Sequence, residues 1–101
     1  MENTKTVVLE VRFRVRDPAA LAEYQAAARR TLSSVGAEPI LRGAVVHAWW
    51  SEEETRPGRL LVRFESRESL ETWFESPAYQ ALSELRERAM DAVFEMIEVA
   101  V

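Results

Sequence analysis

The sequence contains no cysteine, one histidine and three glycines among its 101 residues. The absence of cysteine excludes disulfides, thiolate zinc sites, iron–sulfur clusters and a cysteine nucleophile. The single histidine, His47, cannot form a histidine-rich metal site within one chain. Phosphate-cradling glycine loops, nucleotide fingerprints, HExxH motifs and Ser-His-Asp arrangements are also absent from the sequence. We therefore expect neither a metal nor a cofactor.

Positive charge is scarce as well. The chain has 17 acidic and 13 basic residues, so its net charge is −4. No basic block offsets this charge, and a polyanion such as DNA would be repelled. We expect no nucleic-acid partner. All basic residues except Lys5 are arginine, a bias that fits oxyanion recognition but that we attribute to codon usage, given the many alanines.

Long apolar runs are missing too. The uninterrupted runs extend over only a few residues, far short of the roughly 20 that cross a membrane. The first residues, MENTKTVVLEV, lack the basic region and long apolar run of a signal peptide. We expect a cytoplasmic protein with no membrane partner. The length and the apolar content of 48% are typical of one globular domain, here residues 1–101.

Hydrophobic periodicity predicts a strand and then a helix in the first third of the chain. From Thr6 to Arg16, apolar and polar residues alternate, which is the period of a strand with one dry face. Asp17 and Pro18 predict a helix start, because Asp is a good N-cap and Pro has no N–H to lose. Gly36 is expected to end this helix. Its apolar stripe consists of Leu21, Tyr24, Ala28, Leu32 and Val35.

Three more strands and an interrupted helix are predicted in the remainder. We expect strands over Ile40 to Trp50, Arg59 to Glu65 and Ala92 to Val99, and a polar loop over Ser51 to Gly58. A helix is expected over about Arg67 to Ala89. It has two N-terminal signals ten residues apart, Ser66 and Ser76-Pro77, so we expect a break within it. Its dry stripe consists of Leu70, Trp73, Phe74, Leu82, Leu85 and Ala89.

The predicted order is strand, helix, strand, strand, helix, strand. Two right-handed crossovers joined by a hairpin predict an α+β, ferredoxin-like βαββαβ antiparallel sheet with its helices on one face. The other face would be uncovered in a monomer, and an uncovered single layer is not stable. On the first and third strands that face is a mixture of apolar and charged residues, namely Val8, Glu10, Arg12, Leu61 and Arg63. We expect this face to form a homodimer interface that encloses a polar cavity.

Several short motifs occur in a specific order along nearly the whole chain. They are Asp17-Pro18 with Tyr24 in the helix that follows, Leu41-Arg42-Gly43, Phe64 to Glu68, and Trp73 to Gln80. The last block, WFESPAYQ, is the most specific. With this order and the interrupted helix, the chain resembles the DUF1330 family, a branch of the dimeric α/β-barrel superfamily. The resemblance implies a dimer in which two four-stranded sheets pair face to face to form an α/β barrel, with the helices outside.

Members of that superfamily include cofactor-independent monooxygenases, haem-degrading enzymes, isomerases and dehalogenases, whereas DUF1330 itself implies no established substrate. The sequence departs from the family pattern at two places. Arg42-Gly43-Ala44 stands where Arg-Gly-Gly is usual, and Gly36-Ala37 stands where Gly-Gly is usual. The segment from His47 to Trp50 is also unusually aromatic. A ligand preference therefore does not follow from the resemblance.

Arg42 is the first candidate ligand-binding residue. An arginine in mid-strand can present its guanidinium to a carboxylate or an enolate inside a barrel. Alternatively, Arg42 forms a buried ion pair with Glu10, Glu65 or Glu95, because a mid-strand arginine needs an anionic partner. Both interpretations stay open. The adjacent Gly43 is interpreted as room for a bulge or for a close neighbour.

His47 is the second candidate, because it alone titrates near neutral pH at its unperturbed pKa and suits a general base. Joint use with Arg42 requires both side chains in one cavity. The two residues are five positions apart and face opposite sides of a strand, unless a bulge at Gly43-Ala44 changes the register. A surface or hydrogen-bonded histidine is the alternative interpretation.

Two aromatic residues, Trp50 and Tyr79, are also candidates. Trp49 and Trp50 are neighbours on a predicted strand and must point to opposite faces. One of them is therefore expected in the helix-facing core, and the other against a ligand, a second subunit or the loop. Tyr79 is expected either to pack its ring in the core or to border a pocket.

Arg12 and Arg63 complete the candidate set. They share the second face of neighbouring strands, so we expect them to lie close together. They form either an ion network with Glu10 and Glu65 or a positive lumen for an anionic metabolite.

Three functional hypotheses follow. The leading one is a small-molecule-binding domain with a cavity beside the sheet or between subunits. The second is a cofactor-independent oxygenase or isomerase in which Arg42 stabilises an enolate and His47 is the base. The third is a purely structural dimerisation module. Whether a reaction is catalysed stays open at this point.

Overall fold

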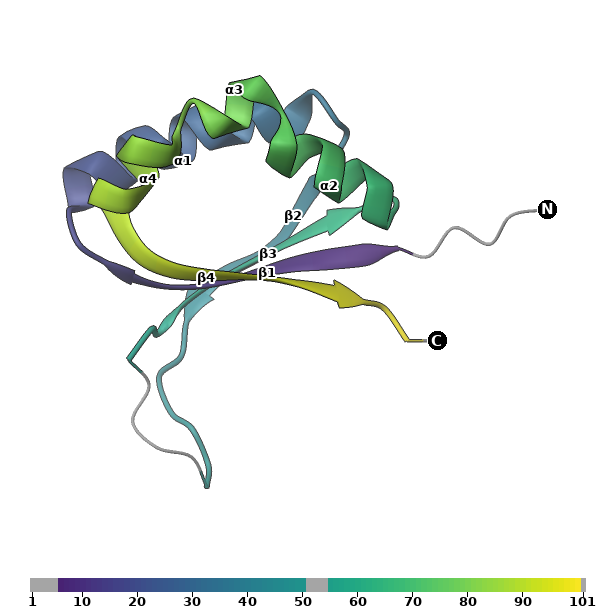
Figure 1. Ribbon diagram of the computed structural model, residues 1–101. Coiled ribbons are helices and arrows are strands. Elements are labelled where there is room, and N and C mark those ends of the chain that lie inside the picture. The colour runs from purple at the N-terminus through teal and green to yellow at the C-terminus, as the bar shows by residue number, and fades with distance from the viewer. Residues whose placement is uncertain (1–5, 51–54, 101) are drawn as a thin grey trace.

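The computed structural model describes residues 6–50 and 55–100, in which four strands and four helices form two layers (Figure 1). The elements are β1 (Val7–Val15), α1 (Pro18–Ser33), β2 (Glu38–Ala44), β3 (Gly58–Phe64), α2 (Arg67–Glu75), α3 (Pro77–Gln80), α4 (Ser83–Ala89) and β4 (Met90–Glu98). The sheet order is β2-β3-β1-β4, and all neighbouring strands are antiparallel. The helices cover one face of this open sheet. The predicted ferredoxin-like α+β fold is confirmed.

Local capping explains where α1 begins and ends. The Asp17 carboxylate accepts hydrogen bonds from the backbone N–H groups of Ala19 and Ala20, at 3.0 and 3.2 Å. Pro18 occupies the first turn, where a missing N–H costs nothing. Gly36 lies just beyond the helix with φ of 69°, a left-handed conformation that glycine adopts without steric penalty. Both predicted boundaries of this helix are confirmed.

The predicted break in the second helical segment is also confirmed. Ser76 has an extended backbone with ψ of 144°, which ends α2. Its hydroxyl then accepts the N–H of Tyr79 at 3.2 Å and so caps α3, which starts at Pro77. A second interruption at Leu82 separates α3 from α4. No helix in the described part of the chain is long and apolar enough to cross a membrane.

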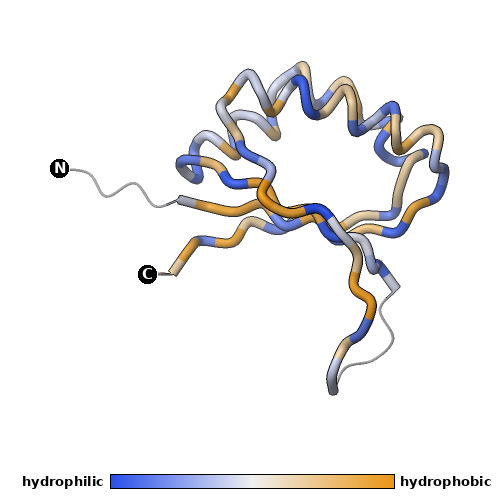
Figure 2. The backbone as a smooth tube through the Cα atoms, turned by 180° about the vertical axis from the view of Figure 1, so that it is seen from behind, coloured by the Kyte–Doolittle hydropathy of each residue, from blue (hydrophilic) through white to orange (hydrophobic). Residues whose placement is uncertain are grey.

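The hydrophobic core lies between the helices and the inner face of the sheet. The apolar faces of β1 and β3 pack there against the apolar stripes of α1 and α2. Figure 2 shows the hydrophobic residues along the strands in orange. Tyr79 is completely buried and stacks against Trp73, with ring centroids 4.1 Å apart. The aromatic residues of the WFESPAYQ block, Trp73, Phe74 and Tyr79, therefore pack in or against the core. The core residues include Val7, Leu9, Val11, Val62, Phe64, Leu70 and Ala89.

Strand β2 differs from the prediction in two ways. It ends at Ala44 and not at Trp50, and the chain beyond it leaves the sheet on the side away from the helices (Figure 1). We call residues 45–50 and 55–57 the β2–β3 arm. One further hydrogen bond, from the N–H of Val45 to the carbonyl of Pro57 at 2.8 Å, joins the two sides of the arm. Residues 51–54 of the predicted polar loop lie outside the described residues.

The register of β2 is irregular before Arg42. Pro39 pairs with Val62 and Leu41 pairs with Leu61, so the shift falls at Ile40. Gly43 and Ala44 pair regularly with Arg59 and Gly58, so the bulge considered at Gly43-Ala44 is not present. An added Cβ at Gly43 would meet no atom within 4 Å, so a close neighbour does not explain this glycine either.

Candidate functional site

A cavity of about 130 Å³ lies between the helices and the inner face of the sheet. Its walls are mostly apolar side chains from α1, α2 and all four strands, including Leu9, Phe13, Leu32, Val62 and Phe94. Protein interiors contain few voids larger than a water molecule. A space of this size within the core is therefore the main candidate for a binding site.

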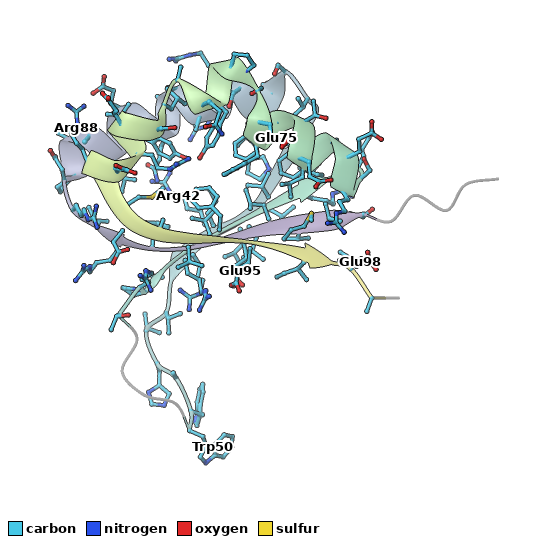
Figure 3. The ribbon with its side chains drawn as sticks, in the orientation of Figure 1. Arg42, Trp50, Glu75, Arg88, Glu95 and Glu98 are labelled. Carbon is cyan, nitrogen blue, oxygen red and sulfur yellow. The ribbon has the colours of Figure 1, made fainter. Side chains whose placement is uncertain are left out.

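The polar side chains of the cavity come from two neighbouring elements. Helix α1 contributes Gln25 and Arg29, and strand β2 contributes Arg42. The Arg42 guanidinium donates a hydrogen bond to the Gln25 side-chain oxygen at 2.8 Å. Figure 3 shows Arg42 in the space between helices and sheet. Asp and Glu side chains are absent from the cavity lining within residues 6–50 and 55–100.

Helical and strand geometry explain how these residues meet. Leu21, Gln25 and Arg29 are four residues apart on α1 and so lie on one face of the helix. On β2, Pro39 pairs with Val62 and Arg42 pairs with Leu60, and all four line the cavity. Residues three apart on a regular strand would face opposite sides. The bulge at Ile40 therefore places Arg42 on the helix side of the sheet.

A buried pair of phenols lies beside the cavity. The hydroxyl oxygens of Tyr24 and Tyr79 are 2.6 Å apart and share a hydrogen bond, and the Arg86 guanidinium donates to the Tyr79 oxygen at 3.2 Å. Burial, together with the nearby Tyr79, raises the pKa of Tyr24 far above its ordinary value. Tyr24 lines the cavity, and its raised pKa keeps its hydroxyl protonated at neutral pH. It is therefore unsuited to act as a base.

Trp73 forms another fixed part of the cavity wall. Its indole N–H donates to the Thr31 hydroxyl at 2.9 Å, and that hydroxyl donates to the carbonyl of Ala28 at 2.7 Å. This chain of hydrogen bonds ties α2 to α1 and holds the indole ring in place against the cavity.

The sequence matches the family described as a domain of unknown function, DUF1330, over residues 7–100. The protein belongs to the DUF1330 family. No match to the sequence was found among curated proteins.

Solved structures share the fold of this DUF1330 protein at low sequence identity. A protein of unknown function from Rhodopseudomonas palustris has a TM-score of 0.79 at 12% identity, with 98% of this chain and 85% of that chain covered. SnoaB, a cofactor-independent oxygenase from Streptomyces nogalater, has a TM-score of 0.69 at 9% identity, with 97% and 96% covered. A dimeric ferredoxin-like protein of unknown function from Thermobifida fusca has a TM-score of 0.64 at 12% identity, with 96% and 93% covered. These similarities establish the fold.

Of the six candidate residues in the DUF1330 chain, Arg42 alone lines the cavity. His47 and Trp50 lie in the β2–β3 arm, and Trp50 is at its exposed tip (Figure 3). The structure therefore does not bring His47 and Arg42 together in one cavity. The expectation that Trp49 or Trp50 belongs to the core is wrong: they are 70% and 100% exposed, because β2 ends before it reaches them. Tyr79 is a fully buried core residue, which contacts Tyr24 of the cavity wall through its hydroxyl but does not itself line the cavity.

Arg12 and Arg63 lie on the outer face of the sheet, and the register separates them. Arg63 is opposite Val8, whereas Arg12 is opposite Arg59. Their carboxylate partners also differ from the expected Glu10 and Glu65. Arg12 forms an ion pair with Glu95 at 2.7 Å, and Arg63 forms one with Glu38 at 2.8 Å.

The alternative interpretation of Arg42, an ion pair with Glu10, Glu65 or Glu95, is absent from the described part of the chain. Glu10 faces Arg59 at 3.8 Å, and Glu95 faces Arg12, both on the outer face of the sheet. Figure 3 shows Glu95 on the opposite side of the sheet from Arg42. Arg42 and these glutamates are therefore separated by the sheet itself.

Gln25 and Arg29 were missed from the sequence. Both border the α1 apolar stripe: Gln25 lies four residues after Leu21, and Arg29 lies three residues before Leu32. Polar residues at the border of an apolar helical stripe are the signal that would have found them. What the sequence did not show is that the sheet leaves space beneath them.

Proposed function

We propose that this DUF1330 protein is a homodimeric domain that binds a small molecule in the cavity between α1 and the sheet. The observation that carries the proposal is the cavity itself, with an apolar wall and a few convergent polar groups from α1 and β2. Such a composition is typical of small-molecule sites, where apolar surface supplies affinity and a few polar groups supply orientation.

The lining favours binding over proton abstraction. Within the described residues it contains no histidine, aspartate or glutamate, and the raised pKa of Tyr24 makes its phenolate inaccessible at neutral pH. An oxygenase or isomerase that pairs Arg42 with His47 would need the histidine inside the cavity, and His47 lies in the β2–β3 arm. The similarity to SnoaB is a similarity of fold at 9% identity, and it does not identify a catalytic base in this chain.

A ligand screen by native mass spectrometry tests the binding proposal. Ala28 is buried and lines the cavity, so Ala28→Leu would fill part of the space. Ala26→Leu on the exposed side of the same helix is the matched control. We expect small-molecule adducts on the wild type and on the control, and none on Ala28→Leu at the same circular dichroism. Leu32→Phe is a second cavity-filling variant, should Ala28→Leu fail to fold.

Two results would refute the binding proposal. Adducts that persist on a folded, cavity-filled variant would place the ligand elsewhere. A screen without any adduct would support the alternative of a purely structural dimerisation module.

The dimer is proposed to form through the outer face of the sheet. This face combines partly exposed apolar residues such as Leu61 and Ile97 with ion pairs such as Arg12–Glu95. The similar protein from Thermobifida fusca is dimeric. Burying such a face removes apolar area from water.

Sedimentation velocity tests this interface. We expect a dimer for the wild type and a shift towards monomer for Leu61→Glu. Ala22→Glu, on the exposed side of α1, should remain dimeric. A wild-type protein that sediments as a monomer would exclude the proposed interface.

A further inference from the structure

The charge of the cavity lining is unbalanced. Arg29 and Arg42 both border the cavity, and no aspartate or glutamate does so among residues 6–50 and 55–100. Arg42 bonds a neutral amide, that of Gln25. Arg29 has neither a hydrogen-bond nor an ion-pair partner within the described parts of the chain. The cavity lining therefore includes two arginines and no carboxylate that could pair with them among the described residues.

The outer face of the same sheet is built differently. There Arg12 pairs with Glu95, Arg14 with Asp91 and Arg63 with Glu38, at 2.7 to 3.2 Å. The chain is rich in carboxylates, with 17 in total, so a shortage of acidic residues does not explain the unpaired cations at the cavity. An anion bound between Arg29 and Arg42 would supply the missing charge through charge-assisted hydrogen bonds.

The polar groups occupy one side of the cavity. Gln25 and Arg29 come from α1 and Arg42 from the adjoining edge strand β2, whereas β1, β3, β4 and α2 contribute apolar side chains to the lining. A ligand that matches this arrangement has its charge at one end and a hydrocarbon body at the other. Arg29 and Arg42 are both exposed residues, so this side of the cavity is the one where a charged end group would keep contact with solvent while the body is buried.

The cavity volume sets the size of the hydrocarbon body. In another protein, an apolar cavity of about 150 Å³ holds one benzene molecule. The cavity of about 130 Å³ found here is close to that size. A single ring therefore fits, and a fused polycyclic system exceeds the space.

We propose that the ligand is a small organic monoanion, with a hydrocarbon body about the size of one benzene ring and a carboxylate held by Arg42 and Arg29. This inference rests on the proposed binding function and specifies the chemistry of the same site.

Three probes of nearly the same shape and different charge test the inference. Benzoate is an anion, benzamide is neutral and benzamidinium is a cation, and all three join one ring to a planar substituent. Binding is followed by NMR on the indole N–H of Trp73, which lines the cavity, with the indoles of Trp49 and Trp50 in the arm as internal references. We expect benzoate to shift the Trp73 signal and to bind at least about tenfold more tightly than benzamide. Benzamidinium should leave the Trp73 signal unchanged.

Charge-removing variants localise the anion site. Arg42→Gln and Arg29→Gln should each weaken benzoate binding roughly tenfold, the effect of losing one charge-assisted hydrogen bond. Benzamide binding should change little in both. Arg30→Gln is the matched control, because Arg30 is an exposed neighbour on α1 that does not line the cavity. These arginines are on the surface, so the variants are expected to fold.

The outcomes separate this inference from the proposed function. Equal or tighter binding of benzamide at Trp73 would overturn the anionic ligand and leave the binding function intact. The anionic ligand would also be overturned if Arg42→Gln and Arg29→Gln bound benzoate with the same affinity as Arg30→Gln. Failure of benzoate to shift the Trp73 signal would overturn the anionic ligand, whereas the ligand screen by native mass spectrometry decides the binding function.

Discussion

The hydrogen-bonded phenols Tyr24 and Tyr79 make a sharp prediction about stability. Tyr79 is completely buried, and its hydroxyl lies between the Tyr24 hydroxyl at 2.6 Å and the Arg86 guanidinium at 3.2 Å. Tyr79→Phe removes the central member of this chain. It leaves the buried Tyr24 hydroxyl and one Arg86 N–H without their partner.

The cost of each change follows from what remains unpaired. Tyr79→Phe should destabilise the protein by about 1–3 kcal/mol, the penalty for an unsatisfied buried polar group. Tyr24→Phe should cost less, about 0.5–1.5 kcal/mol, because Tyr79 keeps its bond from Arg86. The double variant should be no less stable than Tyr79→Phe alone, since the second change removes the orphaned hydroxyl. The implied coupling is about 1 kcal/mol.

Equilibrium unfolding in urea measures these differences, at one fixed protein concentration because the protein is proposed to be a dimer. The four proteins of the cycle should share one m-value, so that the midpoints report stability alone. Additive effects of the two single changes would refute the reasoning. So would a Tyr24→Phe variant that is less stable than Tyr79→Phe.

Three further predictions concern pH, packing and capping. Stability should fall as the pH rises above about 10, because the unfolded chain ionises Tyr24 at its ordinary pKa while the folded state, with its raised pKa, keeps the proton. Urea unfolding from pH 8 to 11 checks this, and a fall that is as steep in Tyr24→Phe would contradict it. Gly58→Ala should cost about 1–2 kcal/mol, since its Cβ would lie 2.6 Å from the Phe13 ring. Gly43→Ala, with open space around it, should change stability by less than about 0.5 kcal/mol, so equal melting temperatures for the two would be inconsistent with this packing. Asp17→Ala should cost about 1 kcal/mol through the lost N-cap of α1, and an unchanged urea midpoint would show that the cap contributes nothing.

Local signals in the sequence were sufficient for the architecture. Alternation in β1, the Asp17-Pro18 start of α1, the glycine at its end and the break at Ser76 all depend on neighbours within a few residues. These elements occur where they were predicted. Their order implies the sheet topology, because short right-handed connections leave few alternatives.

The length of β2 was beyond such reasoning. The aromatic run from His47 to Trp50 has strand propensity, yet the chain leaves the sheet at Ala44. A strand ends where its hydrogen-bonding partner ends, and β3 begins only at Gly58, opposite Ala44. Pairing is a property of two segments, so propensity in one of them does not decide it.

The sequence by itself determined the family, the fold and the apolar faces that build the core, because periodicity and capping are encoded locally. Only the tertiary structure decided which charged residues meet. The bulge at Ile40 turns Arg42 towards α1, and the sheet separates it from Glu10 and Glu95. The cavity likewise arises where side chains from six elements fail to fill the space between them. Such a void depends on packing across the whole domain and leaves no local pattern in the sequence.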